Sequence, residues 1–131
     1  ALCLVGSEMC IRDRPGPKFK EVLEPGQTQT IRTGFAMELP SNAFGMVCTR
    51  SGLAFNNNII VLNSPGIIYS GYRGEIKVIL RNIGNQPYTI QQYSRIAQLV
   101  IVQYGVTKLV PVLQLGDTDR GCKGFGSTGV K

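Results

Sequence analysis

The sequence contains no histidine. This absence removes the side chain that most often acts as a general base near neutral pH and that most often binds metal ions. Carboxylates are also scarce, with eight Asp and Glu residues in a chain of 131. Hydrolytic chemistry in this protein must therefore use one of these few carboxylates, backbone amides, Arg or Lys side chains, or a metal ion that arrives with the substrate.

Long hydrophobic runs are absent too. The longest apolar stretch, residues 96–102, is interrupted by Gln98 and is far too short to span a bilayer, so we expect no membrane partner. The apolar residues 1–5 lack the basic segment that opens a secretory signal. The four cysteines show neither a C-x-x-C pair nor the spacing of metal ligands. This pattern favours a reduced compartment, and we expect a cytoplasmic protein, or a nuclear or organellar one in a eukaryote.

What the sequence does contain is typical of one globular domain. Its hydrophobic fraction is 43% and its charged fraction is 17%, which suits a folded chain long enough to bury a core. The net charge of +6 suits an anionic partner. The basic residues are scattered and no groove-reading motif is present. We therefore interpret the charge as attraction for nucleotide phosphate and expect no nucleic-acid partner.

From residue 18 onward, short apolar or alternating runs are separated by turn-forming residues about every 8–12 positions. No segment carries a sustained helical period. This pattern predicts an all-β fold, a jelly-roll-like sandwich or barrel. The predicted strands are residues 27–33, 44–49, 59–62, 75–80, 88–91, 96–102 and 108–113.

The C-terminal residues 119–131 are rich in glycine and hold little that could pack in a core. One interpretation is a tail that stays unfolded. The other is a cradle for phosphate, because glycines let backbone N–H groups approach an anion closely. In that case Ser127 and Thr128 would add hydroxyl donors and Arg120 a guanidinium, and the segment would become ordered as a lid on ligand binding.

Four stretches of the chain occur in the order and spacing of known motifs and resemble the trimeric dUTP diphosphatase (dUTPase) family. They are residues 49–54 (TRSGLA), 66–75 (GIIYSGYRGE), 95–100 (RIAQLV) and 120–129 (RGCKGFGSTG). The resemblance covers roughly residues 23–130. We divide the chain accordingly into a non-matching segment (1–17), a dUTPase-like β domain (18–117) and a glycine-rich phosphate-binding arm (118–131).

The resemblance implies a jelly-roll homotrimer with three active sites, each shared by three subunits. It implies hydrolysis of dUTP to dUMP and pyrophosphate, which supplies dUMP for biosynthesis and keeps uracil out of DNA. It also implies that Mg²⁺ is carried on the substrate triphosphate, with no direct protein ligands.

The resemblance further assigns roles to particular residues. One subunit contacts phosphate, a second supplies the hairpin that reads the uracil edge and lies under the deoxyribose, and a third closes over the nucleotide. The residues of the first set are Arg50, Ser51, Gly52 and Gln98, and the resemblance also makes Gln98 a catalytic residue. Those of the second are Asn63, Gly66, Ile68, Tyr72 and Lys77. Those of the third are Arg120, Phe125, Gly126, Ser127 and Thr128, with Phe125 over the uracil face.

Two departures from the family pattern bear on the chemistry. Tyr69 stands where the family has the Asp that acts as general base, and a phenol, which keeps its proton at neutral pH, is a poor base. The first motif is also broken, because Arg14 stands where a second Asp belongs. Residues 1–14 read like translated vector sequence, and we interpret them as a replacement of the natural N-terminus.

Three functions follow from these residues. The first is a working dUTPase, which rests on the four motifs. The second is a catalytically inactive dUTPase-like protein that binds nucleotide or regulates, which rests on Tyr69 and the broken first motif. The third is a β-sandwich interaction protein without a nucleotide site, which the intact glycine-rich arm disfavours.

Overall fold

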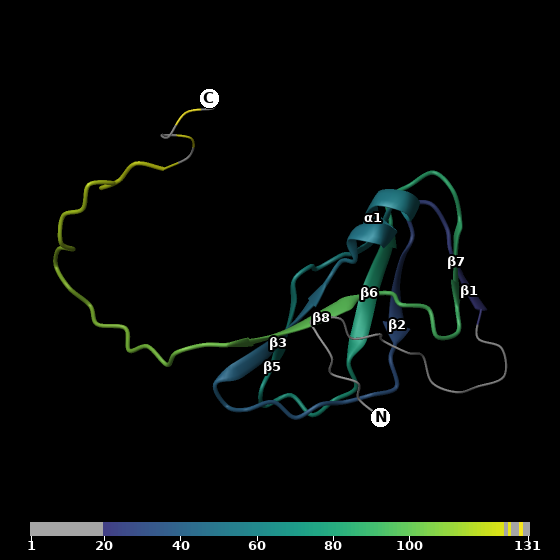
Figure 1. Cartoon of the computed structure of the whole chain (residues 1–131), viewed down its shortest axis with the longest axis horizontal. Helices are drawn as coiled ribbons and strands as arrows, with labels where there is room; N and C mark the ends of the chain where they lie inside the picture. The colour runs from purple at the N-terminus through teal and green to yellow at the C-terminus, as the bar shows by residue number, and fades with distance from the viewer. Residues whose placement is uncertain (1–19, 125, 127–128, 130–131) are drawn as a thin grey trace.

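The computed structural model describes residues 20–124, 126 and 129. The predicted motif at Arg14 and the foreign-looking residues 1–14 lie outside these residues. The described chain is all-β apart from one short helix, as predicted (Figure 1). Its elements are β1 (Lys20–Leu23), β2 (Thr28–Arg32), β3 (Ala43–Cys48), α1 (Ser51–Asn57), β4 (Ile59–Val61), β5 (Gly66–Tyr69), β6 (Lys77–Asn82), β7 (Tyr88–Gln91) and β8 (Gln98–Gln103).

The strands form three small antiparallel sheets around one core. The first pairs β1 with β7, the second has the order β2-β6-β4, and the third has the order β5-β3-β8. Burial alternates along β3 and along β6, because successive side chains of a strand point to opposite faces. The core is formed by Leu23, Ile31, Val47, Ile59, Val61, Ile76, Val78, Leu80, Ile90, Ile96, Ala97 and Leu99.

One polar side chain, Asn82, is completely buried at the end of β6. Its Nδ2 donates to the carbonyl oxygens of Leu23 at 2.9 Å and Gln86 at 2.7 Å. Its Oδ1 accepts the Gly84 N–H at 2.9 Å. Burial of an amide is tolerated where its donors and acceptors are paired. Asn82 therefore ties β1 and the turn before β7 to the central strand.

The helix α1 was not predicted. It has seven residues, too few to display a helical period in the sequence. It ends at Asn58, which adopts a left-handed conformation (φ 56°) and donates its N–H to the carbonyls of Ala54 and Leu53. This is a common way to close a helix, because asparagine tolerates that conformation better than most residues.

The predicted strand at residues 108–113 was wrong. Beyond β8 the described chain is exposed and irregular, and it runs away from the three sheets (Figure 1). Leu109 is 93% exposed and Val110 is 67% exposed. A strand needs a neighbour to satisfy its backbone groups, and within the described part of the subunit this segment has none. In the same part of the chain, no helix is long and apolar enough to cross a membrane.

Candidate functional site

The strand pairing of the β5-β3-β8 sheet brings three of the predicted site segments to one end of that sheet. Val47 lies opposite both Gly66 on β5 and Leu99 on β8, and the next residue of β3 lies opposite Gln98. Arg50 follows two residues after β3 ends. Residues that are 48 positions apart in the sequence, such as Arg50 and Gln98, thus flank the same strand end.

Arg50 leads from β3 into α1. Its backbone is extended (φ −80°, ψ 128°), and its carbonyl accepts the Ala54 N–H at 3.0 Å. Its guanidinium Nη1 is buried, and no hydrogen-bond acceptor among the described residues reaches it. A buried charged donor without a partner is costly, so this nitrogen favours an anionic oxygen from outside the subunit. Ser51 and Gly52 lie beside it, exposed, in the first turn of α1.

The loop between β4 and β5 is fastened to the end of β3. The Thr49 N–H donates to Ser64 Oγ at 3.0 Å, and Thr49 Oγ1 accepts the Val61 N–H at 2.9 Å. A side chain at position 66 would place its Cβ 2.9 Å from Asn63 Nδ2, closer than such atoms normally approach. Gly66 therefore allows the Asn63 side chain to fold over the start of β5. Neither Thr49 nor Ser64 was among the predicted site residues.

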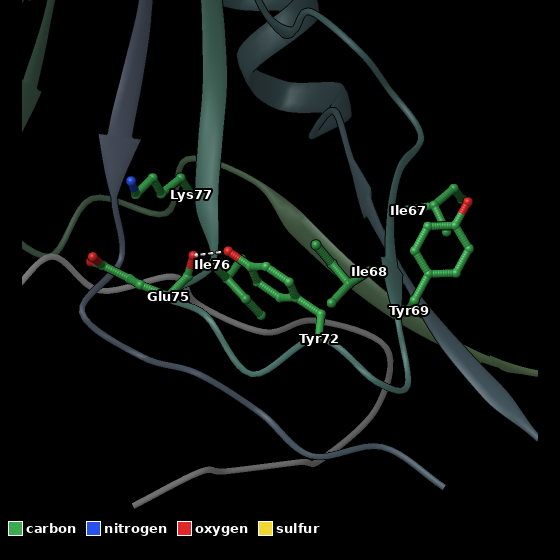
Figure 2. A pocket seen from close by; sticks show the side chains of 7 residues that line it. All are labelled: Ile67, Ile68, Tyr69, Tyr72, Glu75, Ile76 and Lys77. Atoms are coloured by element: carbon green, nitrogen blue, oxygen red, sulfur yellow. Dashed lines mark hydrogen bonds between the residues drawn. The ribbon is translucent and has the colours of Figure 1, made fainter. Parts of the chain in front are cut away.

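A cavity of about 220 Å³ lies between β5 and the start of β6 (Figure 2). Ile68 and Tyr72 face it from the hairpin side, and Lys77 borders it from β6. The Tyr72 hydroxyl donates to the carbonyl of Glu75 at 3.1 Å. The structure thus brings Ile68, Tyr72 and Lys77 of the predicted set together around one hollow, while Asn63 and Gly66 are not part of its lining. Its lining comprises Ile67, Ile68, Tyr69, Tyr72, Glu75, Ile76 and Lys77.

Tyr69, at the predicted position of the general base, is 73% exposed. Its ring is directed away from Tyr72 (Figure 2), since Ile68 and Tyr69 alternate between the faces of β5. The same ring borders a second, more apolar hollow of about 410 Å³ with Phe44 and Tyr104. The rings of Phe44 and Tyr104 lie 5.8 Å apart. Tyr69 is therefore part of an aromatic rim, where the family pattern predicts a carboxylate.

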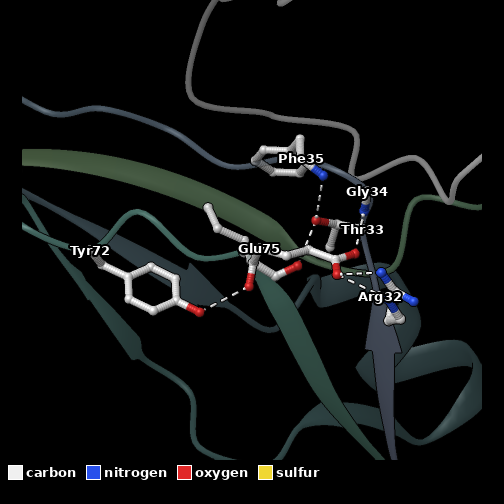
Figure 3. A network of polar contacts seen from close by, with 7 residues as sticks. Arg32, Thr33, Gly34, Phe35, Tyr72 and Glu75 are labelled. Carbon is white, nitrogen blue, oxygen red and sulfur yellow. Dashed lines mark hydrogen bonds and ion pairs between the residues drawn. The ribbon is translucent and has the colours of Figure 1, made fainter.

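Glu75, the carboxylate in the lining of the first cavity, is already engaged (Figure 3). Its Oε1 accepts the Gly34 N–H at 2.9 Å, and its Oε2 accepts from Arg32 Nε at 2.9 Å. The Gly34 hydrogen bond and the Arg32 charge lower the pKa of Glu75 from its ordinary value of 4.5. A low pKa makes a weak base. These contacts and the lowered pKa disfavour Glu75 as a substitute for the Asp of the family pattern.

The glycine-rich arm does not join these residues within one subunit. Arg120 is exposed, its Nε donates to the Lys123 carbonyl at 3.1 Å, and the arm lies far from the sheets (Figure 1). Gly126 is exposed as well. The predicted residues Phe125, Ser127 and Thr128 lie outside the described residues. Among those described, no group of three or more His, Cys, Asp or Glu side chains could hold a metal ion.

Comparison with known proteins gives a consistent result. The sequence pattern of the dUTPase family matches residues 19–129. A deoxyuridine 5'-triphosphate nucleotidohydrolase of Caldanaerobacter subterraneus is 47% identical over 113 residues, which cover 86% of this chain and 76% of that protein. One from Cytophaga hutchinsonii is 50% identical over 108 residues, covering 82% and 70%.

Solved structures extend the comparison to the fold. The dUTPase of Staphylococcus bacteriophage 80alpha with bound dUPNHPP superposes with a TM-score of 0.83 at 26% identity, covering 97% of this chain and 88% of that one. A G164S variant of the same phage enzyme with dUpNHpp gives a TM-score of 0.77 at 28% identity, covering 85% and 81%.

Proposed function

The chain belongs to the dUTPase family, a family of dUTP nucleotidohydrolases, and from this premise we propose that it binds dUTP in a site assembled from three copies of the chain. The observation that carries the proposal is the convergence of Arg50, Gln98 and Gly66 at one end of the β5-β3-β8 sheet. The buried Nη1 of Arg50 without a partner supports a phosphate contact. The reaction is hydrolysis of dUTP to dUMP and pyrophosphate.

Within this site, each segment has a distinct task. Arg50, Ser51, Gly52 and Gln98 hold phosphate oxygens. The loop at Asn63 and Gly66 presents main-chain donors and acceptors in a fixed pattern, which suits the edge of uracil. The ring of Tyr72 and the side chains of Ile68 and Lys77 form the hollow for the sugar. Mg²⁺ carried on the triphosphate would supply neutralisation of the charge that develops on the phosphates.

The glycine-rich arm closes the site from a neighbouring subunit in a homotrimer. Two observations support this arrangement. The arm lies away from its own sheets, and the apolar side chains that precede it, including Leu109 and Val110, are exposed and without packing on their own subunit. In the closed state Arg120, Gly126, Ser127 and Thr128 contact phosphate and Phe125 covers the base. Exclusion of bulk water by such a lid favours hydrolysis by one positioned water molecule.

Tyr69 determines how fast this particular chain turns dUTP over. A phenol in place of the Asp removes the group that would take a proton from the attacking water. We therefore propose that the chain as written binds dUTP and hydrolyses it slowly. The second candidate function, a nucleotide-binding or regulatory protein without turnover, is favoured by the same residue. The free thiols of Cys48 and Cys122 support a reducing, cytoplasmic location.

Two measurements test the proposal. Calorimetry with a non-hydrolysable imido analogue of dUTP measures binding, and pyrophosphate release in Mg²⁺ measures turnover. We expect the chain to bind the analogue and to turn dUTP over at least ~10²-fold more slowly than a Tyr69→Asp variant, the scale of general-base effects. Tyr69→Asn is the matched control, which removes the ring without adding a carboxylate and should stay slow. Equal rates for the chain and Tyr69→Asp would show that another residue supplies the base.

A further inference from the structure

The Tyr72 ring is fixed at two points by its own hairpin. Its hydroxyl donates to the backbone carbonyl of Glu75 at 3.1 Å. Its Cζ would lie 2.6 Å from a Cβ at position 74, so the ring lies against Gly74 and leaves no room for a larger residue. The Tyr72 N–H also donates to the Tyr69 carbonyl at 3.0 Å. The ring that borders the sugar hollow is therefore held by the backbone of residues 74 and 75.

That backbone is held in turn by the Glu75 side chain (Figure 3). Oε1 accepts the Gly34 N–H at 2.9 Å, Oε2 accepts from Arg32 Nε at 2.9 Å, and Arg32 Nη2 forms an ion pair with Oε2 at 2.9 Å. Arg32 ends β2, and Gly34 adopts φ +75°, a conformation that glycine takes readily and that other residues avoid. The carboxylate thus fastens residue 75, two positions before β6, to β2, the strand that pairs with β6.

The Glu75 carboxylate binds only β2 and the turn that follows it among the described residues. Both carboxylate oxygens are used by β2 and the turn after it, and the side chain points to Arg32 on the side opposite to Tyr72 (Figure 3). Its exposure is limited, with 21% of the side chain accessible in the pair with Arg32. Two further hydrogen bonds hold the adjoining backbone. The Ile76 N–H, in the same peptide group as the Glu75 carbonyl, donates to the Phe35 carbonyl at 2.9 Å, and Thr33 Oγ1 donates to the Ile76 carbonyl at 2.6 Å. The carboxylate is the side-chain contact that adds to the backbone hydrogen bond of the Ile76 N–H in fastening residue 75.

We propose that Glu75 is a positioning residue for sugar recognition: by holding the carbonyl that binds the Tyr72 hydroxyl, it fixes the ring that excludes a 2′-hydroxyl group. This inference rests on the proposed function and deepens it. An apolar surface rejects an added hydroxyl only modestly, by about 10² at most. Such a modest discrimination depends on the ring being unable to move aside. The discrimination between deoxyribose and ribose then depends on a carboxylate whose oxygens bind Arg32 and Gly34 and not the Tyr72 ring.

The test measures the dissociation constants of the imido analogues of dUTP and UTP by calorimetry, and takes their ratio as the selectivity. We expect Glu75→Ala to lower the selectivity about tenfold, through tighter binding of the ribonucleotide relative to the deoxyribonucleotide. Glu75→Gln keeps an oxygen acceptor and should retain most of the selectivity. Glu38→Ala is the matched control, because Glu38 pairs with Arg73 of the same hairpin at 3.4 Å and is largely exposed; its selectivity should stay unchanged.

A double-mutant cycle separates positioning from a general loss of structure. Tyr72→Phe removes the hydroxyl through which Glu75 acts, so Glu75→Ala should change the selectivity little in that background. Equal effects of Glu75→Ala in both backgrounds, or an unchanged selectivity in the Glu75→Ala single variant, would overturn the inference while leaving the proposed function in place. Failure of the unaltered chain to bind either analogue would overturn the proposed function and this inference together.

Discussion

At the scale of single residues, Arg50 shows how a residue that serves ligand binding can lower the stability of the folded subunit. Its buried Nη1 has no acceptor among the described residues, so in the free subunit this nitrogen of the guanidinium is desolvated without compensation. We expect Arg50→Met to leave the free energy of unfolding unchanged or to raise it slightly, because methionine fills much of the same space. Affinity for the dUTP analogue should fall about 10²-fold, the scale of a lost charge-assisted contact.

Urea denaturation and calorimetry on the same preparation check this prediction. The affinity for deoxyuridine, which has no phosphate, serves as the internal control and should change little. If the affinity for deoxyuridine falls as much as the affinity for the triphosphate, Arg50 maintains the shape of the site and does not bind phosphate.

Gly66 provides a second prediction at this scale. A methyl group at this position would meet Asn63 Nδ2 at 2.9 Å, and the flexible Asn63 side chain can rotate away at small cost. We therefore expect Gly66→Ala to fold with nearly normal stability and to bind the dUTP analogue at least about tenfold more weakly, a loss of about 1.4 kcal/mol. Gly71→Ala is the control, because a Cβ there meets nothing within 4 Å. Equal affinities of the two variants would count against a role for this loop in binding.

Asn82 is the residue on which stability should depend most. Replacement by alanine leaves the carbonyls of Leu23 and Gln86 and the Gly84 N–H without their partners. Each buried unpaired group costs about 1–3 kcal/mol, so we expect a loss of about 3 kcal/mol or more in the free energy of unfolding. The midpoint of urea denaturation measures this loss. Gln86→Ala, which keeps the accepting carbonyl, should stay within about 0.5 kcal/mol of the unaltered protein.

At the scale of elements, the ion pair between Arg32 and Glu75 joins the end of β2 to the start of β6. The pKa of Glu75 is lowered in the folded protein by the Gly34 hydrogen bond and by Arg32. Its contribution to stability is therefore present above the unfolded value near 4.5 and is lost as the pH falls through the lower, folded value. Glu75→Gln should flatten this part of the pH dependence of thermal unfolding. A slope below pH 4.5 that is identical in both proteins would refute the assignment.

Most of the strands could be predicted because their side chains alternate. Tyr88–Gln91 was predicted with its observed bounds, and Thr28–Arg32 lies inside the predicted 27–33. Alternation fails as a guide where an element is too short or has no neighbour. The seven-residue α1 shows no period, and residues 108–113 look like a strand although no strand among residues 20–124 pairs with them.

The residues of the candidate site could be predicted from the resemblance to family motifs, but not from the periodicity and composition of the chain. The sequence places Arg50 and Gln98 far apart, and only the register of β3 against β8 brings them together. The fastening of the hairpin by Thr49, Ser64 and Glu75 was missed, because a hydrogen bond between distant residues leaves no local signal.

At the scale of the whole molecule, the exposed segment after β8 predicts association. Leu113 is fully exposed in the subunit and Leu109 nearly so; both have apolar surface that a neighbouring copy would bury. We expect sedimentation analysis to give the mass of a trimer for the unaltered chain. The double variant Leu109→Asp, Leu113→Asp should shift the distribution towards monomers. Lys108→Glu, a charge change in the same segment without loss of apolar surface, should leave the trimer intact.

The central position of β3 has a consequence for protein synthesis. β3 pairs with β5 on one side and with β8 on the other. Cys48 can pair with Gln98 only after the ribosome has synthesised residue 98. Pairings of such long range form slowly, because a large loop must first close. A nascent chain that ends before Gln103 therefore holds an unpaired β3 edge, which is open to pairing with other chains until translation has passed that point.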